Sequence, residues 1–181
     1  DGRPAASQRI VMGAIGMGGR CLGQQVLHNF LAEPEVQMVA VCDVHKGRRE
    51  AARHLVDSKY GNKDCAVYGD MRRFLAERTD VDAVLIATGD RWHALASVLS
   101  MRAGKDVYCE KPLCRTIEEG RQMVEAARRY ARIVQMGTQY RSIAKSRQAC
   151  EWIRNGRLGP VHTVRLTHAA NPVYPCEAAR P

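Results

Sequence analysis

The stretch IVMGAIGMGGRC, residues 10–21, decides the fold that this sequence predicts. Its first six residues form an apolar run typical of a buried strand. Three glycines follow at Gly16, Gly18 and Gly19, and a helical pattern begins at Cys21. Glycine permits a tight turn at position 16, and at position 18 it lets the backbone come close to a ligand. With the N–H groups of a helix start behind it, such a turn is typical of a pyrophosphate-binding loop.

The third position of the G-x-G-x-x-G pattern falls on Cys21 instead of glycine. This position serves close packing between helix and strand, so a small thiol can take the place of glycine. A lone glycine pattern is weak evidence, because glycines also serve ordinary tight turns. Its position between a strand and a helix is what favours the phosphate-binding interpretation.

Strand and helix patterns alternate along the rest of the chain. We expect further strands at residues 36–41, 66–68, 83–87, 106–109, 132–136 and 161–167, and helices at 21–31, 46–60, 71–77, 92–103, 116–130 and 146–155. Strands that are apolar on both faces and alternate with helices favour a mostly parallel sheet covered by helices. The predicted fold class is therefore α/β, a doubly wound sheet of the Rossmann type.

The charge balance favours a small-molecule ligand over nucleic acid. The chain has 28 Lys and Arg against 19 Asp and Glu, a net charge of +9. The basic residues form only short pairs, such as Arg48-Arg49 and Arg128-Arg129, and aromatic residues make up 6% of the chain. A nucleic-acid interface usually carries a denser basic patch. We therefore expect no nucleic-acid partner.

Cysteine usage and hydropathy bear on the compartment. Seven cysteines occur without a CxxC pair, which indicates free thiols in a reducing compartment and no metal site. No apolar run approaches the ~18 residues that span a bilayer, so we expect no membrane association. The cytoplasm is the expected location. The polar segment Asp1 to Gln8 is a tag remnant, a loose arm or a processed terminus, and processing after export to the periplasm is the alternative.

Asp43 closes the second predicted strand. An acid at this place accepts hydrogen bonds from the adenosine ribose, which favours NAD as the cofactor over NADP. Lys46 and Arg48 follow closely and could contact a 2′-phosphate, so NADP stays possible. The alternatives are a solvated carboxylate at Asp43 and a Rossmann protein of the methyltransferase type.

Ligands of doubly wound sheets bind at the carboxyl ends of the strands. Two such ends carry unusual residues: TGDRWH at residues 88–93 and Glu110-Lys111-Pro112. Beside a cofactor, a lysine can donate or accept a proton, and Glu110 could position its ammonium group or bind a ribose hydroxyl. The ordinary alternative is a surface Glu-Lys pair before a strand-terminating proline, with His93 as a polar residue of the first helical turn.

Five motifs together resemble the Gfo/Idh/MocA oxidoreductase family: GMGGR at 16–20, Asp43 followed by Arg48, IATGDRWH at 86–93, AGKDVYCEKPL at 103–113 and VQMGTQYR at 134–141. The resemblance covers roughly residues 9–168, and AGKDVYCEKPL is its most specific part. It implies hydride transfer between NAD(P) and a carbohydrate or polyol. It also implies a nucleotide-binding domain followed by an α/β substrate domain, and we expect a homo-oligomer at full length.

The resemblance also implies roles for individual residues. Lys111 would be the catalytic lysine and would also contact the cofactor. Along the cofactor, Gly16, Gly18, Gly19 and Arg20 would contact the pyrophosphate, Asp43 and Arg48 the adenosine end, and Thr88, Gly89, His93, Glu110, Gln139 and Arg141 the nicotinamide end. The family proline after Thr88 is Gly89 here, which makes that loop more flexible.

The expected domains are a polar arm at 1–8, a dinucleotide-binding Rossmann domain at 9–140 and an incomplete start of the substrate domain at 141–181. Family members carry a D-x-x-x-H arrangement in the second domain, and no such arrangement precedes Pro181. We therefore expect a truncated chain. Two further functions stay open: glycoside cleavage by an NAD-dependent enzyme of the same family, and a dinucleotide-binding fragment without catalysis.

Overall fold

The computed structural model describes residues 4–5 and 8–167 of the 181-residue chain. The chain forms two compact units, residues 1–138 and 139–181. The first contains the strands and most of the helices. The second contains the 3₁₀ turn η4 (Gln139–Ser142) and α6 (Ala144–Arg154). The assignment of this second unit to a substrate domain stays a prediction.

The first unit is built on a six-stranded parallel sheet in the order β3-β2-β1-β4-β5-β6. Its strands are β1 (Ile10–Ile15), β2 (Val36–Cys42), β3 (Ala66–Tyr68), β4 (Ala83–Ile86), β5 (Asp106–Glu110) and β6 (Val134–Gly137). This order is that of the dinucleotide-binding Rossmann fold, in which the chain reverses direction across the sheet between β1 and β4. The predicted α/β doubly wound fold is confirmed.

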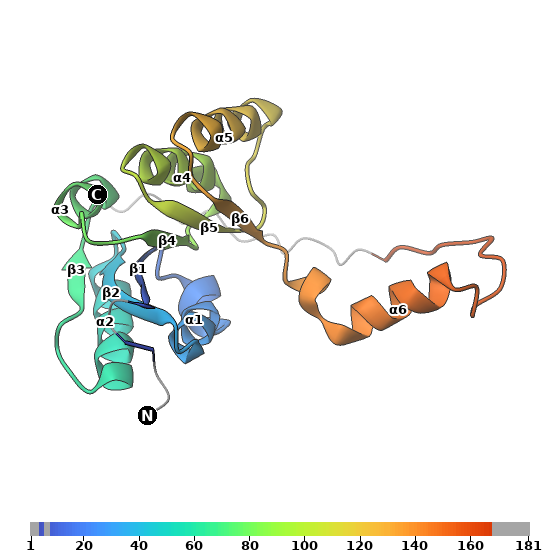
Figure 1. The fold of residues 1–181 in the computed structure, drawn as a ribbon, viewed down its shortest axis with the longest axis horizontal. Helices are drawn as coiled ribbons and strands as arrows, with labels where there is room; N and C mark the ends of the chain where they lie inside the picture. Colours follow the sequence, from blue (N-terminus) through green and yellow to red (C-terminus); the bar gives the residue numbers. More distant parts are fainter. Residues whose placement is uncertain (1–3, 6–7, 168–181) are drawn as a thin grey trace, which may run out of the picture. The chain divides into compact units, whose positions relative to one another are not determined.

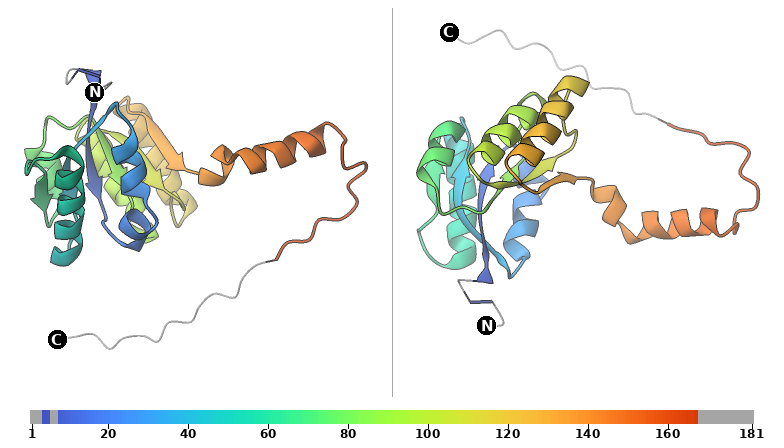
Figure 2. Two further views of the ribbon diagram at one scale, coloured as in Figure 1. Left: turned by 90° about the horizontal axis from the view of Figure 1, so that it is seen from below. Right: turned by 45° about the horizontal axis from the view of Figure 1, so that its top comes forward.

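Helices cover both faces of the sheet (Figures 1 and 2). The helical elements of the first unit are η2 (Gly19–Gly23), α1 (Val26–Ala32), α2 (Lys46–Tyr60), α3 (Met71–Glu77), η3 (Asp90–Trp92), α4 (His93–Arg102) and α5 (Ile117–Arg129). One face packs against α1 and α2, and the other against α3, α4 and α5. Parallel strands need crossover connections, which are usually helices. This is why the sequence alternates between strand and helix patterns.

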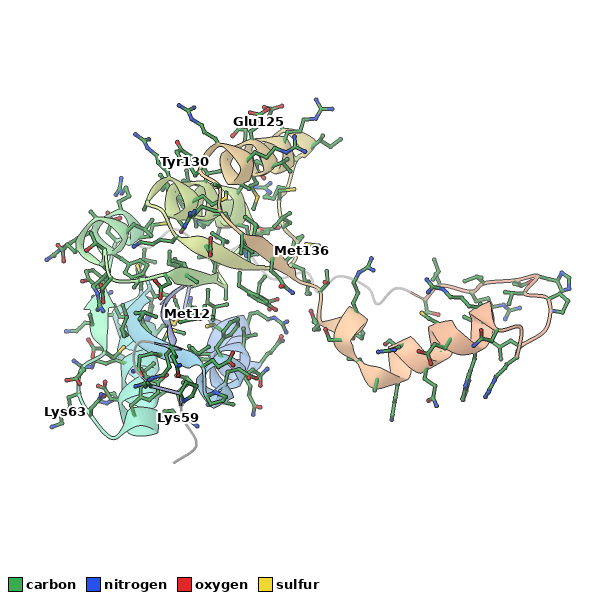
Figure 3. All side chains as sticks on the ribbon, in the orientation of Figure 1. Met12, Lys59, Lys63, Glu125, Tyr130 and Met136 are labelled. Carbon is green, nitrogen blue, oxygen red and sulfur yellow. The ribbon has the colours of Figure 1, made fainter. Side chains whose placement is uncertain are left out.

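Two cores fill the space between the sheet and its helices. Met12, Leu27 and Met38 belong to the first core, and Phe74 and Met101 to the second. Figure 3 shows Met12 among the packed side chains near the centre of this unit. Full burial of one such side chain stabilises the fold by about 1.5–3 kcal/mol. The cores thus hold the strand ends in fixed positions.

The helix ends follow the local sequence signals. Asp70 caps α3 by accepting a hydrogen bond from Arg72 N at 2.8 Å. Thr116 caps α5 by accepting from Glu119 N at 3.2 Å, and the Glu119 carboxylate accepts from Arg115 N at 2.7 Å. Both signals are side-chain oxygens placed where a helix start leaves N–H groups unpaired.

Two sequence predictions of secondary structure are wrong. The single helix expected at 21–31 is divided into the π-helical turn η2 and α1, because Gln25 adopts a left-handed conformation with φ of 63° between them. A single-residue break leaves the apolar periodicity intact, so the pattern does not reveal it. The strand expected at 161–167 is absent: these residues are exposed and have no strand partner among the described residues. A strand needs such a partner for its backbone hydrogen bonds.

In the part of the chain that the structure describes, no helix is long and apolar enough to cross a membrane. The same part contains no group of three or more His, Cys, Asp or Glu side chains that could hold a metal ion.

Six cysteines lie in the described residues, and all six are free thiols. Burial raises the pKa of Cys21, Cys42 and Cys65 to about 12 and that of Cys109 to about 11. Because the thiolate is the reactive form, these four should resist alkylation of the native protein at neutral pH. Exposed Cys150 should react first. Peptide mapping by mass spectrometry after brief iodoacetamide treatment checks this. Rapid labelling of Cys21 without denaturant would contradict it.

Candidate functional site

A cavity of about 580 Å³ lies at the carboxyl ends of the strands in the first unit. It spans the point between β1 and β4 where the strand order reverses, which is where open α/β sheets bind ligands. Seven residues that the sequence predicted as cofactor-binding line it: Gly16, Gly18, Gly19, Asp43, Arg48, Thr88 and Gly89. They come from the turns after β1, β2 and β4 and from the first residues of η2 and α2, which the parallel sheet brings to one edge.

Gly16 is required by the folding of the chain itself. Its φ is +89°, a conformation that other residues adopt only with strain. A Cβ at this position would lie 2.5 Å from Thr88 N and 2.7 Å from Thr88 Cα. The Gly16 N–H also donates to Cys42 O at 2.8 Å. Glycine therefore allows the turn after β1 to pass directly between the ends of β2 and β4.

Gly18 and Gly19 are different, since the packing of the chain does not require glycine at either position. A Cβ at Gly18 would have Arg48 Nη1 as its nearest neighbour, at 3.9 Å, and a Cβ at Gly19 would meet no atom of the described residues within 4 Å. Both residues line the cavity. Their missing side chains leave backbone accessible from the cavity, which fits the close approach of a pyrophosphate.

Asp43 is buried at the end of β2 and holds the glycine loop in place. Its Oδ2 accepts from Met17 N at 2.7 Å, and its Oδ1 accepts from His45 N at 2.7 Å. It is thus no solvated strand-end carboxylate. Each carboxylate oxygen has two acceptor positions, so the group retains capacity for a ribose hydroxyl.

We expect Asp43→Ala to destabilise the domain. The change leaves the buried Met17 N–H without its acceptor, which costs about 1–3 kcal/mol of unfolding free energy. Asp43→Asn, which retains one oxygen, should fall between alanine and the parent. Urea denaturation measures all three. Glu125→Ala, which removes an exposed carboxylate on α5 (labelled in Figure 3), is the control and should change little. Equal effects of Asp43→Ala and Glu125→Ala would contradict this role.

Arginines give the cavity wall its positive charge. Arg72 forms an ion pair with Asp70 at 2.6 Å, and the hydrogen bonds from Arg72 lower the pKa of the Asp70 carboxyl to about 2. Arg72 is therefore balanced by a carboxylate. Arg48 and Arg91 also line the cavity, and neither forms an ion pair within the described residues. These two guanidinium groups suit an anionic ligand.

Arg91 and Trp92 of the TGDRWH stretch also line the cavity. Several cavity residues were not singled out by the sequence analysis as ligand-binding: Val44, Gly69, Asp70, Met71, Arg72, Leu95 and Leu99. Four of them, residues 69–72, follow β3 directly. The sequence could have predicted them, because every strand of a parallel sheet ends at the same edge and the turn after β3 lies at that edge. Side chains such as Val44 and Met71 add apolar surface to the cavity.

Four predicted site residues of the first unit do not line this cavity: Arg20, His93, Glu110 and Lys111. The structure pairs two of them with each other, since Arg20 Nε donates to Glu110 Oε2 at 3.0 Å and Glu110 is only 3% exposed. This ion pair joins the glycine loop to the end of β5. Their contacts with a cofactor stay predictions.

His93 is buried between two strand-end turns. Its Nδ1 lies 2.6 Å from Pro112 O and its Nε2 3.1 Å from Thr88 O. Lys111 is exposed on the turn after β5 and precedes Pro112 through a cis peptide bond. The ring nitrogens of His93 lie against the two backbone carbonyls, and the contact of this residue with the cofactor stays a prediction. Gln139 and Arg141 belong to the second unit, and their predicted roles are untested.

Comparison with known proteins agrees with this geometry. A family model described as an oxidoreductase family with an NAD-binding Rossmann fold, GFO_IDH_MocA, matches residues 10–138. The chain is 39% identical over 90 residues to a 1,5-anhydro-D-fructose reductase from Ensifer adhaerens, which covers 50% of this chain and 27% of that protein. It is 35% identical over 129 residues to a glycosyl hydrolase family 109 protein from Solibacter usitatus, covering 69% and 28%. The chain thus spans about a quarter of the length of these relatives.

The fold is also similar to a solved structure. The crystal structure of myo-inositol 2-dehydrogenase from Lactobacillus plantarum matches 83% of this chain and 42% of that chain, with a TM-score of 0.72 and 24% sequence identity. At this identity the likeness shows a shared fold.

Proposed function

Since the chain belongs to the Gfo/Idh/MocA oxidoreductase family, with its NAD-binding Rossmann fold, we propose that it is the cofactor-binding part of an NAD-dependent enzyme that oxidises or reduces a sugar or polyol. The observation that carries the proposal is the cavity at the β1–β4 reversal, with Gly18 and Gly19 leaving backbone open toward it. The reductase named among its relatives supports the substrate class.

The cavity residues fit NAD in three parts. Gly18, Gly19 and Arg48 would hold the pyrophosphate through backbone N–H groups and a guanidinium, and Asp43 would accept a ribose hydroxyl. The adenine would lie against the apolar surface of Val44. NAD supplies a hydride acceptor at its nicotinamide when bound.

Lys111 is the candidate for proton transfer. It lies on the turn after β5. This strand pairs with β4, and the residues that follow β4 line the cavity. Its ammonium group would orient a substrate hydroxyl and, as the free amine, take up its proton. The hydroxyl oxygen loses this proton while the carbon that bears the hydroxyl loses a hydride to NAD. Together these two losses convert an alcohol to a carbonyl.

A second candidate is glycoside cleavage. The glycosyl hydrolase family 109 protein and the α-N-acetylgalactosaminidase from Shewanella oneidensis among the relatives favour it. In that reaction the cofactor undergoes no net change, whereas a dehydrogenase converts it stoichiometrically.

Fluorescence titration with NADH tests cofactor binding by the chain, and a panel of sugars, polyols and N-acetylhexosaminides tests turnover by the complete polypeptide. Stoichiometric conversion of NAD with a polyol would support the proposal. Release of free sugar from a glycoside without net conversion of NAD would establish the second candidate. Binding of NADH with no conversion of any panel member would count against both, and failure to bind NADH would remove their common basis.

A further inference from the structure

His93 spans the ends of two neighbouring strands. β4 and β5 pair in parallel up to Ile86 and Cys109, and beyond this point the chain leaves each strand in its own turn. The turn after β4 passes through Thr88, and the turn after β5 through Lys111 and Pro112. The His93 side chain, only 2% exposed, lies with one ring nitrogen against a carbonyl of each turn.

The two contacts serve different parts of the site. Thr88 lines the cavity, and Pro112 directly follows Lys111 in sequence. A neutral imidazole carries one N–H and donates to one of the two carbonyls, whereas the doubly protonated ring donates to both. Because His93 is buried and α4 begins at this residue, the ring is fixed relative to the helix, which packs in the second core. It thus fixes the backbone beside the lysine to the wall of the cavity.

We propose that His93 is a positioning residue for Lys111, acting through the Pro112 carbonyl, and not a ligand of the dinucleotide. The proposal rests on the proposed function, since it assigns Lys111 its position in that reaction. The lysine side chain is exposed and long, so the direction in which it leaves the backbone depends on the backbone carbonyls around it. Arg20 holds the preceding residue in the same way, through its 3.0 Å ion pair with buried Glu110. The residues before and after Lys111 are therefore both held by buried contacts.

Two isosteric substitutions separate the two contacts. An asparagine amide nitrogen lies roughly where Nδ1 of histidine lies, and a glutamine amide nitrogen roughly where Nε2 lies. His93→Asn should therefore retain the contact with Pro112 O, whereas His93→Gln should retain only the contact with Thr88 O. His93→Leu removes both. His54→Gln, at an exposed position of α2, is the control for a histidine substitution as such.

The first readout is the reactivity of Lys111 toward an acetylating reagent, followed by mass spectrometry of the 181-residue chain. Exposed Lys59 and Lys63 serve as internal references. The Lys111 acetylation rate should rise by about fivefold in His93→Gln and His93→Leu, because loss of one hydrogen bond loosens the backbone of the turn that carries the lysine. His93→Asn should restore the parent rate. Equal rates in all four proteins, or an effect of Asn as large as that of Gln, would overturn the proposal.

The second readout separates positioning from cofactor binding. The Kd for NADH should stay unchanged in His93→Gln, because His93 does not line the cavity and this variant retains the contact with Thr88 O. In the complete polypeptide, kcat should fall about 10- to 100-fold in His93→Gln with KM unchanged, the effect of a misplaced reacting group. A raised Kd for NADH with normal Lys111 reactivity would show a cofactor ligand and overturn the proposal. If no substrate turns over, the proposed function fails while the acetylation result still decides the role of His93.

Discussion

Replacing Gly16 by alanine is expected to abolish NADH binding and to destabilise the domain. A residue with a Cβ in the left-handed conformation costs about 1–2 kcal/mol. The new Cβ would also lie 2.5 Å from Thr88 N, and this backbone, in the turn directly after β4, cannot move away as a flexible side chain could. Overpacking of this kind adds about 1–3 kcal/mol. The turn after β1 and the cavity wall at Thr88 would both shift. Urea denaturation and NADH fluorescence titration measure the two losses.

Gly19→Ala is the matched control for this experiment. It adds the same methyl group three positions along the same loop, where it meets no atom of the described residues within 4 Å. Its unfolding free energy should therefore stay within about 1 kcal/mol of the parent, the range of a Gly-to-Ala change in backbone entropy. NADH binding should still weaken, because the methyl group faces the cavity. Normal binding in Gly16→Ala, or unfolding of Gly19→Ala, would contradict this account of the loop.

Lys111→Met is expected to lower kcat by about 10²–10⁴-fold in the complete polypeptide, the range for loss of a general acid–base group. NADH affinity should stay unchanged, because Lys111 does not line the cavity. Steady-state kinetics and NADH titration of the same preparation measure both quantities. Lys63→Met, at an exposed position that Figure 3 labels, should leave both unchanged.

Lys111→Arg distinguishes proton transfer from simple orientation by charge. The guanidinium retains the positive charge but does not release a proton in proteins. If Lys111 transfers a proton, the arginine variant should be as slow as the methionine variant. If arginine restores most of kcat, the lysine only orients the substrate, and the proton-transfer assignment is wrong.

The sequence predicted the sheet well because its signals are local. Buried strands such as β4 are apolar on both faces, and the caps at Asp70 and Thr116 stand directly before their helices. The break at Gln25 was missed, since the left-handed conformation of one residue changes no periodicity. The strand expected at 161–167 also failed, because alternation of apolar residues does not supply the neighbouring strand that a sheet requires.

The sequence predicts a cavity residue where that residue follows a strand and is of a type that suits a dinucleotide, such as a loop glycine or a strand-end acid. Gly16, Gly18 and Asp43 meet both conditions, and all three line the cavity. The structure joins Arg20 and Glu110, which the sequence placed along the cofactor, across 90 positions of sequence. Such a pairing cannot be derived from either residue alone, because it depends on which strands become neighbours and on which face each side chain lies.

The strand order has a consequence for how this domain is assembled during synthesis. β1 has β2 on one side and β4 on the other, and Val11 N donates to a carboxylate 71 positions later, at Asp82. The second edge of β1 therefore stays unpaired until synthesis has reached β4. Contacts so distant in sequence slow folding. A nascent chain halted between β3 and β4 would carry the glycine loop and Asp43 but lack the wall at Thr88, so dinucleotide binding should appear only when β4 has joined the sheet.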